Sequence, residues 1–227
     1  MAWNLLFRAA SDLFTPAFHH PGDTIVATKA YDPKQLEELL LQALQTEIGG
    51  INVYSAALEC AIDDDLRKEW EDYLEETHNH HAILLNVFEE LGLDPEKNSP
   101  GRQIVAHHGR SLVEAIKMAK AGAEPEAVQL VAAECVVLAE TKDHMNWELI
   151  GHLAKEAKSG STRVLKQAYE AVEQQEDHHL YHTTGWTREL WIKALGMPAV
   201  LPPPEEVKNV ETAIGASRAE QARSQML

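Results

Sequence analysis

Six residues, four glutamates and two histidines, have the types and the spacing of a metal site inside a helical protein: Glu47, Glu75, His78, Glu140, Glu176 and His179. The pattern Glu-x-x-His occurs twice among them, and this spacing places both side chains on one face of a helix, where they can bind one ion. Four carboxylates that face a protein interior repel one another and are costly to bury, so they need positive charge close by. The same helical positions carry no Lys or Arg in the sequence. We therefore expect two bound metal ions, and oxygen donors with a minority of nitrogen donors favour iron or manganese.

The positions of the two Glu-x-x-His pairs are more informative than their number, because chance alone gives roughly one or two such pairs in a chain of this composition. Both pairs fall in predicted helices, the second and the fourth, and each is followed three residues later by another histidine, His81 or His182. The two lone glutamates fall in the first and third helices, and each is followed seven residues later by an aromatic residue, Tyr54 or Trp147. The two halves of the chain therefore resemble a degenerate repeat of one helical hairpin.

Further polar residues lie close to the predicted ligands. His144, His81 and His182 are each expected to be an additional ligand or a residue that supports the ligands and lines the pocket. Asp143 and Asp177 are expected on the solvated face, with the orientation of an imidazole as the alternative reading. The histidines that we expect to point elsewhere are His80, His178, His107 and His108.

Four long helices should position these residues. Leu, Ala, Glu and Gln dominate long stretches without Gly or Pro, which favours an all-α fold. Capping residues, prolines and glycines place the helices at about 33–62, 64–91, 125–158 and 161–195. The inward face predicted for the second helix consists of Trp70, Leu74, His78, His81, Leu85 and Phe88, with Glu75 beside it.

The second and third helices are joined by a long connection, residues 93–124, in which we predict one short helix at 111–121. A long crossover at this place is the topology of ferritin-like four-helix bundles. We assign residues 32–196 to the bundle, 1–31 to an irregular N-terminal segment, and 197–227 to a proline-rich break and a peripheral tail.

The order of these residues resembles a known superfamily. One lone glutamate, a Glu-x-x-His pair, a second lone glutamate and a second Glu-x-x-His pair is similar to the pattern of bacterioferritins, rubrerythrins and their relatives, over residues 33–195. The resemblance implies that Glu75 and Glu176 bridge two metal ions, and that Glu47 and Glu140 each bind one. It also implies a role in catalysis for Tyr54, because bacterioferritin-like helices carry a tyrosine seven residues after the first glutamate; the alternative is that Tyr54 fills space.

Composition excludes several classes of function. The net charge of −16 argues against nucleic-acid binding and against docking on an anionic membrane. The two cysteines are far apart and outside any C-x-x-C motif, which favours buried thiols in a reducing compartment. We find neither a cleaved signal nor a membrane span in the sequence, so we expect a cytoplasmic protein. Proteins of this class commonly assemble, and we expect a homo-oligomer, a dimer or larger.

Three functions are compatible with such a site. The leading hypothesis is an oxidoreductase whose dinuclear iron or manganese centre reacts with O2 or peroxide, with an electron donor that the sequence does not name. The first alternative is iron sequestration or storage in a ferritin-like oligomer. The second is a helical interaction protein with a zinc site or a vestigial site.

Overall fold

The structure is a computed structural model that describes residues 31–156, 160–205 and 212–226. The predicted irregular segment 1–31 lies outside the described residues, except for Tyr31. Within the described ranges the chain forms six helices and no strand, so the prediction of an all-α fold is confirmed. The helices are α1 (Pro33–Leu58), α2 (Asp64–Leu91), α3 (Pro100–Gly122), α4 (Pro125–Glu156), α5 (Gly160–Ala194) and α7 (Thr212–Ser224).

The helix boundaries follow from local capping chemistry. The Asp32 side chain accepts a hydrogen bond from the backbone N–H of Lys34, and Pro33 occupies the first turn of α1. Asp63 caps α2 in the same way, and Gly92 ends α2 in the left-handed conformation that glycine adopts without strain. The first helix ends at Leu58, four residues before the predicted end.

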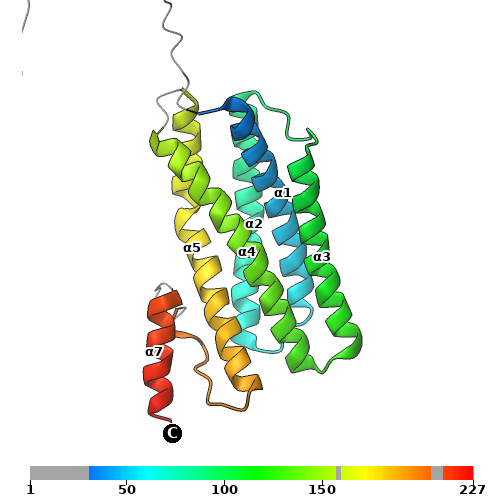
Figure 1. Cartoon of the computed structure of the whole chain (residues 1–227), viewed down its shortest axis with the longest axis vertical. Coiled ribbons are helices and arrows are strands. Elements are labelled where there is room, and N and C mark those ends of the chain that lie inside the picture. Colours follow the sequence, from blue (N-terminus) through cyan, green and yellow to red (C-terminus); the bar gives the residue numbers. More distant parts are fainter. Residues whose placement is uncertain (1–30, 157–159, 206–211, 227) are drawn as a thin grey trace, which may run out of the picture.

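Four helices pack as a closed ring around a shared interior, in the order α1, α2, α5, α4 (Figure 1). α3 lies outside this ring and packs against α1 and α4. Because the ring is closed, each of its helices turns one face inward, and residues at the same height on all four helices can meet.

The crossover differs from the prediction, because α3 is a full helix of 23 residues instead of a short segment at 111–121. Ser99 caps its first turn by accepting a hydrogen bond from the N–H of Arg102 at 3.0 Å. Gly109 lies inside the helix, where glycine ordinarily lowers helix propensity. Here it lets two helices touch, since a Cβ atom at this position would lie 3.1 Å from the Cα atom of Gly49 on α1.

The predicted peripheral tail contains α7, which packs against α5. Two ion pairs hold the region in place. The Glu205 carboxylate is fully buried and pairs with Arg188, and Arg223 on α7 lies 3.1 Å from Glu189 on α5. The C-terminal part is therefore attached to the bundle through buried charges.

The interior of the ring has two apolar clusters separated by a polar layer. One cluster includes Val53, Trp70, Val136 and Trp186, and the other includes Leu40, Leu84, Ile150 and Leu165. Along each helix of the ring the polar residues fall between these two clusters. The layer is thus shielded from water on both sides along the bundle axis. No helix among the described residues is long and apolar enough to cross a membrane.

Candidate metal centre

Six ionisable side chains of the polar layer are almost completely buried, and none is more than 3% exposed: Glu47, His80, Glu140, Asp143, Glu176 and His179. They come from all four helices of the ring. Four acidic groups and two imidazoles at one height of a bundle are a costly arrangement unless charges or hydrogen bonds compensate them.

Glu176 lies at the centre of this layer and belongs to two groups of close donor atoms. In the first group, donor atoms of His80, Glu176 and His179 all lie within 4.8 Å of one another. In the second group, the same holds for Glu47, Asp143 and Glu176. The Nδ1 atom of His80 is 2.9 Å from Oε1 of Glu176. Each group could hold one cation, and Glu176 is the residue that both groups share.

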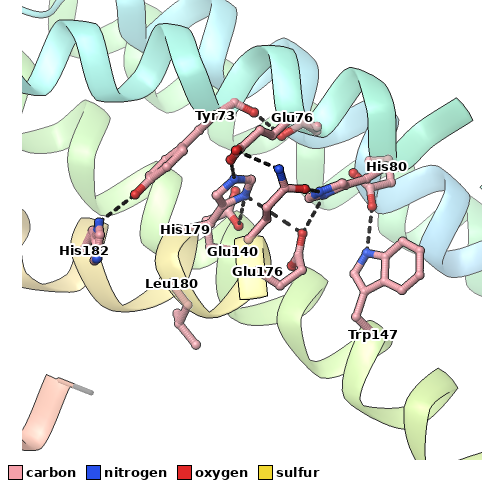
Figure 2. A network of polar contacts seen from close by, with 12 residues as sticks. Tyr73, Glu76, His80, Glu140, Trp147, Glu176, His179, Leu180 and His182 are labelled. Atoms are coloured by element: carbon pink, nitrogen blue, oxygen red, sulfur yellow. Dashed lines mark hydrogen bonds and ion pairs between the residues drawn. The ribbon is translucent and has the colours of Figure 1, made fainter. Parts of the chain in front are cut away.

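Glu140 completes the first group from the side of α4. Its Oε2 atom lies 3.5 Å from Nδ1 of His179, which in turn is 3.9 Å from Oε1 of Glu176. Figure 2 shows dashed contacts from His179 to the carboxylates of both Glu140 and Glu176. Three donors therefore face one another over distances that a cation could bridge.

The second group shows the clearest need for positive charge. The Glu47, Asp143 and Glu176 carboxylates each keep one buried oxygen, Oε2, Oδ1 and Oε2 respectively, without a hydrogen-bond partner among the described residues. The other oxygen of Glu47 accepts a hydrogen bond of 2.8 Å from Nε1 of Trp147. Buried carboxylate oxygens without donors are rare in folded proteins. Three of them in one place fit a cation.

The electrostatics agree with this geometry. Burial raises the pKa of Glu176 to about 8, and the charge of Glu140 adds to the effect. Burial and the charge of Asp143 raise the pKa of Glu47 well above its ordinary value, and burial and Glu176 do the same for Asp143. Without a cation the Glu176 carboxyl group holds a proton near neutral pH, and burial favours the protonated forms of Glu47 and Asp143. A metal ion would take the place of those protons.

Two residues outside the groups orient the imidazoles. Nε2 of His179 lies 2.8 Å from Oε2 of Glu76, and Oε1 of Glu76 accepts a hydrogen bond from Nε2 of Gln175 at 2.8 Å. Since Gln175 donates from its nitrogen, its Oε1 atom accepts from Nε2 of His80, also at 2.8 Å. Both imidazoles are thus held by Nε2, and Nδ1 of each faces the carboxylates. Such outer hydrogen bonds fix the tautomer of histidine ligands.

The pKa of His179 reflects the same contacts. Burial lowers it, but the hydrogen bonds to Glu140 and Glu76 outweigh burial and raise the pKa to about 10. Burial and the neighbouring His179 lower the pKa of His80. The two rings therefore differ in charge before any metal binds.

The structure brings four of the six predicted ligands together, Glu47, Glu140, Glu176 and His179, but not Glu75 and His78. Both of these side chains lie on the exposed face of α2. The predicted inward face of α2 is wrong in register: the buried stripe contains Leu66, Trp70, Tyr73, Thr77, His80, Leu84 and Phe88. Glu76 and His80 therefore face the interior in place of Glu75 and His78.

The expectations for two further residues are also wrong. His80 was expected to point away, yet it is fully buried against Glu176. Asp143 was expected on the solvated face, yet it is buried in the second group. It lies one turn from Glu140 on α4, and this three-residue spacing is the sequence signal that could have identified it.

The additional candidates lie around the two groups. His81 is half-buried on α2, outside both groups. His144 is also half-buried, and its Nε2 atom lies 2.9 Å from Oδ1 of Asp177, which therefore orients this imidazole. Tyr54 is buried, and burial together with the adjacent Glu140 raises the pKa of its hydroxyl well above the ordinary value.

His182 contacts a tyrosine that the sequence did not single out. Its Nδ1 atom lies 2.7 Å from the hydroxyl of Tyr73, and the Tyr73 ring packs on His179 with 4.2 Å between ring centroids. Figure 2 shows this series running from His182 through Tyr73 to His179. His182 thus supports the first group from a distance instead of joining it.

Comparison with known proteins gives one informative similarity. The chain is 25% identical over 115 residues to the encapsulin nanocompartment cargo protein EncC of Myxococcus xanthus (strain DK1622). The match covers 51% of this chain and 80% of the Myxococcus protein. No protein-family model matches the sequence, and no solved structure matches it.

Proposed function

We propose that the chain is a ferritin-like bundle that binds two iron or manganese ions and reacts with O2 or peroxide. The observation that carries the proposal is that Glu176 belongs to both groups of donor atoms, so its carboxylate would be shared by the two ions. His80, Glu140 and His179 would bind the first ion, and Glu47 and Asp143 the second. This set differs from the predicted one by replacing the pair on α2 with His80 and by adding Asp143.

The donor set supports this choice of metals. Carboxylate oxygens with a minority of imidazole nitrogens suit iron and manganese, and such sets occur in the interior of four-helix bundles. Two redox-active ions supply Lewis acidity and electrons for chemistry on O2 or peroxide. Glu76 and Gln175 orient the two imidazoles, and the apolar clusters exclude water from both ends of the layer. The hydroxyl of Tyr54 keeps its proton at neutral pH, beside Glu140.

Metal analysis of matched variants tests the proposal. The protein is purified without a chelating tag and loaded with Fe(II) or Mn(II), and about two ions per chain are expected. Glu47→Ala and Asp143→Ala should each lose at least one ion per chain while the helical circular dichroism is retained. Glu75→Ala, an exposed glutamate on α2, is the control and should bind as the original does. Unchanged metal content in both interior variants would refute the site.

The similarity to a protein named as an encapsulin cargo supports a second candidate, an iron-sequestering protein that works inside a nanocompartment. The two candidates differ in how much Fe(II) each chain oxidises. An oxidoreductase that awaits another substrate should stop after about two Fe(II) per chain in air. Continued oxidation of added Fe(II), with ferric mineral that remains with the protein, would favour storage.

A further inference from the structure

A cavity of about 320 Å³ lies between α1, α3 and α4, on the side of the ring that α3 covers. Its wall is mostly apolar, with Val53 from α1, Val105 and Leu112 from α3, and Leu138 and Ala139 from α4. It is separate from the polar layer. The cavity is lined by Thr46, Ala139 and Lys142, and the residues that follow them, Glu47, Glu140 and Asp143, belong to the metal centre. Because successive residues of a helix point about 100° apart, the two sets of side chains face different directions.

Glycines shape this cavity. Gly49 and Gly109 bring α1 and α3 into contact along one edge, and Gly50 contributes no side chain to the floor. The two helices therefore meet at one edge and leave a hollow beside it. A volume of this size is at the small end of pockets that bind organic ligands.

One charged side chain lines the cavity. The Lys142 ammonium donates a hydrogen bond to Oδ1 of Asn146, which is fully buried. Nδ2 of Asn146 in turn donates to Oγ1 of Thr46 at 2.9 Å. Asn146, the hydrogen-bond partner of Lys142, is neutral, and among the described residues no carboxylate oxygen lies within 4.0 Å of the Lys142 nitrogen.

We propose that this cavity binds a small apolar carboxylic acid, with its carboxylate paired to the Lys142 ammonium and its hydrocarbon part against Val53, Leu112 and Ala139. The acid supplies the missing counter-ion, and its apolar part covers the exposed apolar wall. A medium-chain or aryl acid matches the volume. The proposal does not depend on the metal centre, because no residue of the two metal groups lines the cavity.

The proposal is tested by measuring the binding of octanoate to the full chain with titration calorimetry. Octan-1-ol serves as the uncharged probe of similar shape. Octanoate should bind saturably at one site, at least about tenfold more tightly than the alcohol. Lys142→Met should weaken octanoate binding by at least about tenfold and leave the alcohol unaffected, whereas Lys142→Arg should retain binding. Lys117→Met, which changes an exposed lysine on α3, is the control.

A second variant keeps the test informative if Lys142→Met fails to fold. Leu112→Trp fills the cavity from α3 and should weaken the binding of both probes. The proposal is overturned if octanoate does not bind saturably, if both probes bind equally well, or if the folded Lys142→Met variant binds octanoate normally. Metal content is measured in the same samples, so that failure of the metal proposal is seen separately.

Discussion

The Nδ1 atom of His80 on α2 lies 2.9 Å from Oε1 of Glu176 on the neighbouring helix α5. His80 reaches Glu176 because the buried stripe of α2 passes through Tyr73, Thr77 and His80, at helical spacings of four and three. The contact therefore places His80 in the candidate metal site, and Glu75 and His78 remain on the exposed face of α2.

Substitutions of His80 and His78 on α2 should have different effects on metal binding, because His80 is buried and His78 is exposed. His80→Ala removes a nitrogen donor of the first group and should lose about one metal ion per chain. His78→Ala changes an exposed residue two positions away and should leave metal content unchanged. Metal content of both variants, loaded and desalted in parallel, is the measurement. Metal loss in His78→Ala alone would contradict the assigned register.

Orientation of the imidazoles should matter almost as much as their presence. Glu76→Gln removes the charged acceptor at Nε2 of His179 but keeps the size of the side chain. Metal affinity should fall by about 10–100-fold, because outer hydrogen bonds fix the ligand ring. Competition with a chelator of known affinity measures the change, and Glu75→Gln is the matched control on the exposed face. Equal affinity of the two variants would show that Glu76 has no orienting role.

Thermal stability of the metal-free protein should fall as the pH rises. The folded-state pKa of Glu176, about 8, lies above the ordinary 4.5, so its contribution is complete below 4.5 and is lost as the pH rises through 8. His179, with a pKa of about 10 against 6.5, acts in the same direction and loses its contribution at still higher pH. Scans between about pH 5 and 9 should therefore show a decreasing Tm.

Added metal should reverse this trend, since the ions replace protons on the buried carboxyl groups. The rise in Tm caused by Mn(II) should grow with pH, and Glu176→Gln should flatten the profile of the metal-free protein. A metal-free Tm that increases steadily over the same pH range would contradict the assigned electrostatics.

The C-terminal region should depend on its buried carboxylate. Glu205→Ala removes the partner of Arg188 and leaves space beside Gly185 and Gly215. Arg188 is partly exposed and keeps its contact to Glu189, so the loss should be about 1–3 kcal/mol in urea unfolding. Proteolysis near α7 should also become faster. Glu220→Ala, which changes an exposed glutamate on α7, is the control.

The sequence predicted most helix boundaries because capping is a local property. Asp32 and Asp63 are flanked by residues that start helices, and Gly92 can end one without strain. The full length of α3 could not be predicted, because Gly101 and Gly109 lower its helix propensity. The helix is stabilised by packing against α1, which lies far away in the sequence.

The candidate site was predictable where an ionisable residue stands alone in an apolar stripe, as Glu47 does. Residues 75–81 of α2 are polar at every position. The local pattern therefore does not distinguish an inward pair Glu75 and His78 from an inward pair Glu76 and His80. Packing of Tyr73 and Leu84 inside the ring decides the register, and such tertiary contacts are not visible in a local pattern. Asp143 was expected on the solvated face although it lies three residues after Glu140, close to the same side of α4.

The shared role of Glu176 in a two-metal site is tested most directly by the stoichiometry of Mn(II) binding to the original protein and to Glu176→Ala, combined with electron paramagnetic resonance of the bound ions. We expect about two ions per chain with the signal of a spin-coupled pair, and loss of the pair when the shared carboxylate is removed. Two ions that are magnetically isolated, or a Glu176→Ala variant that keeps the coupled pair, would contradict this shared role.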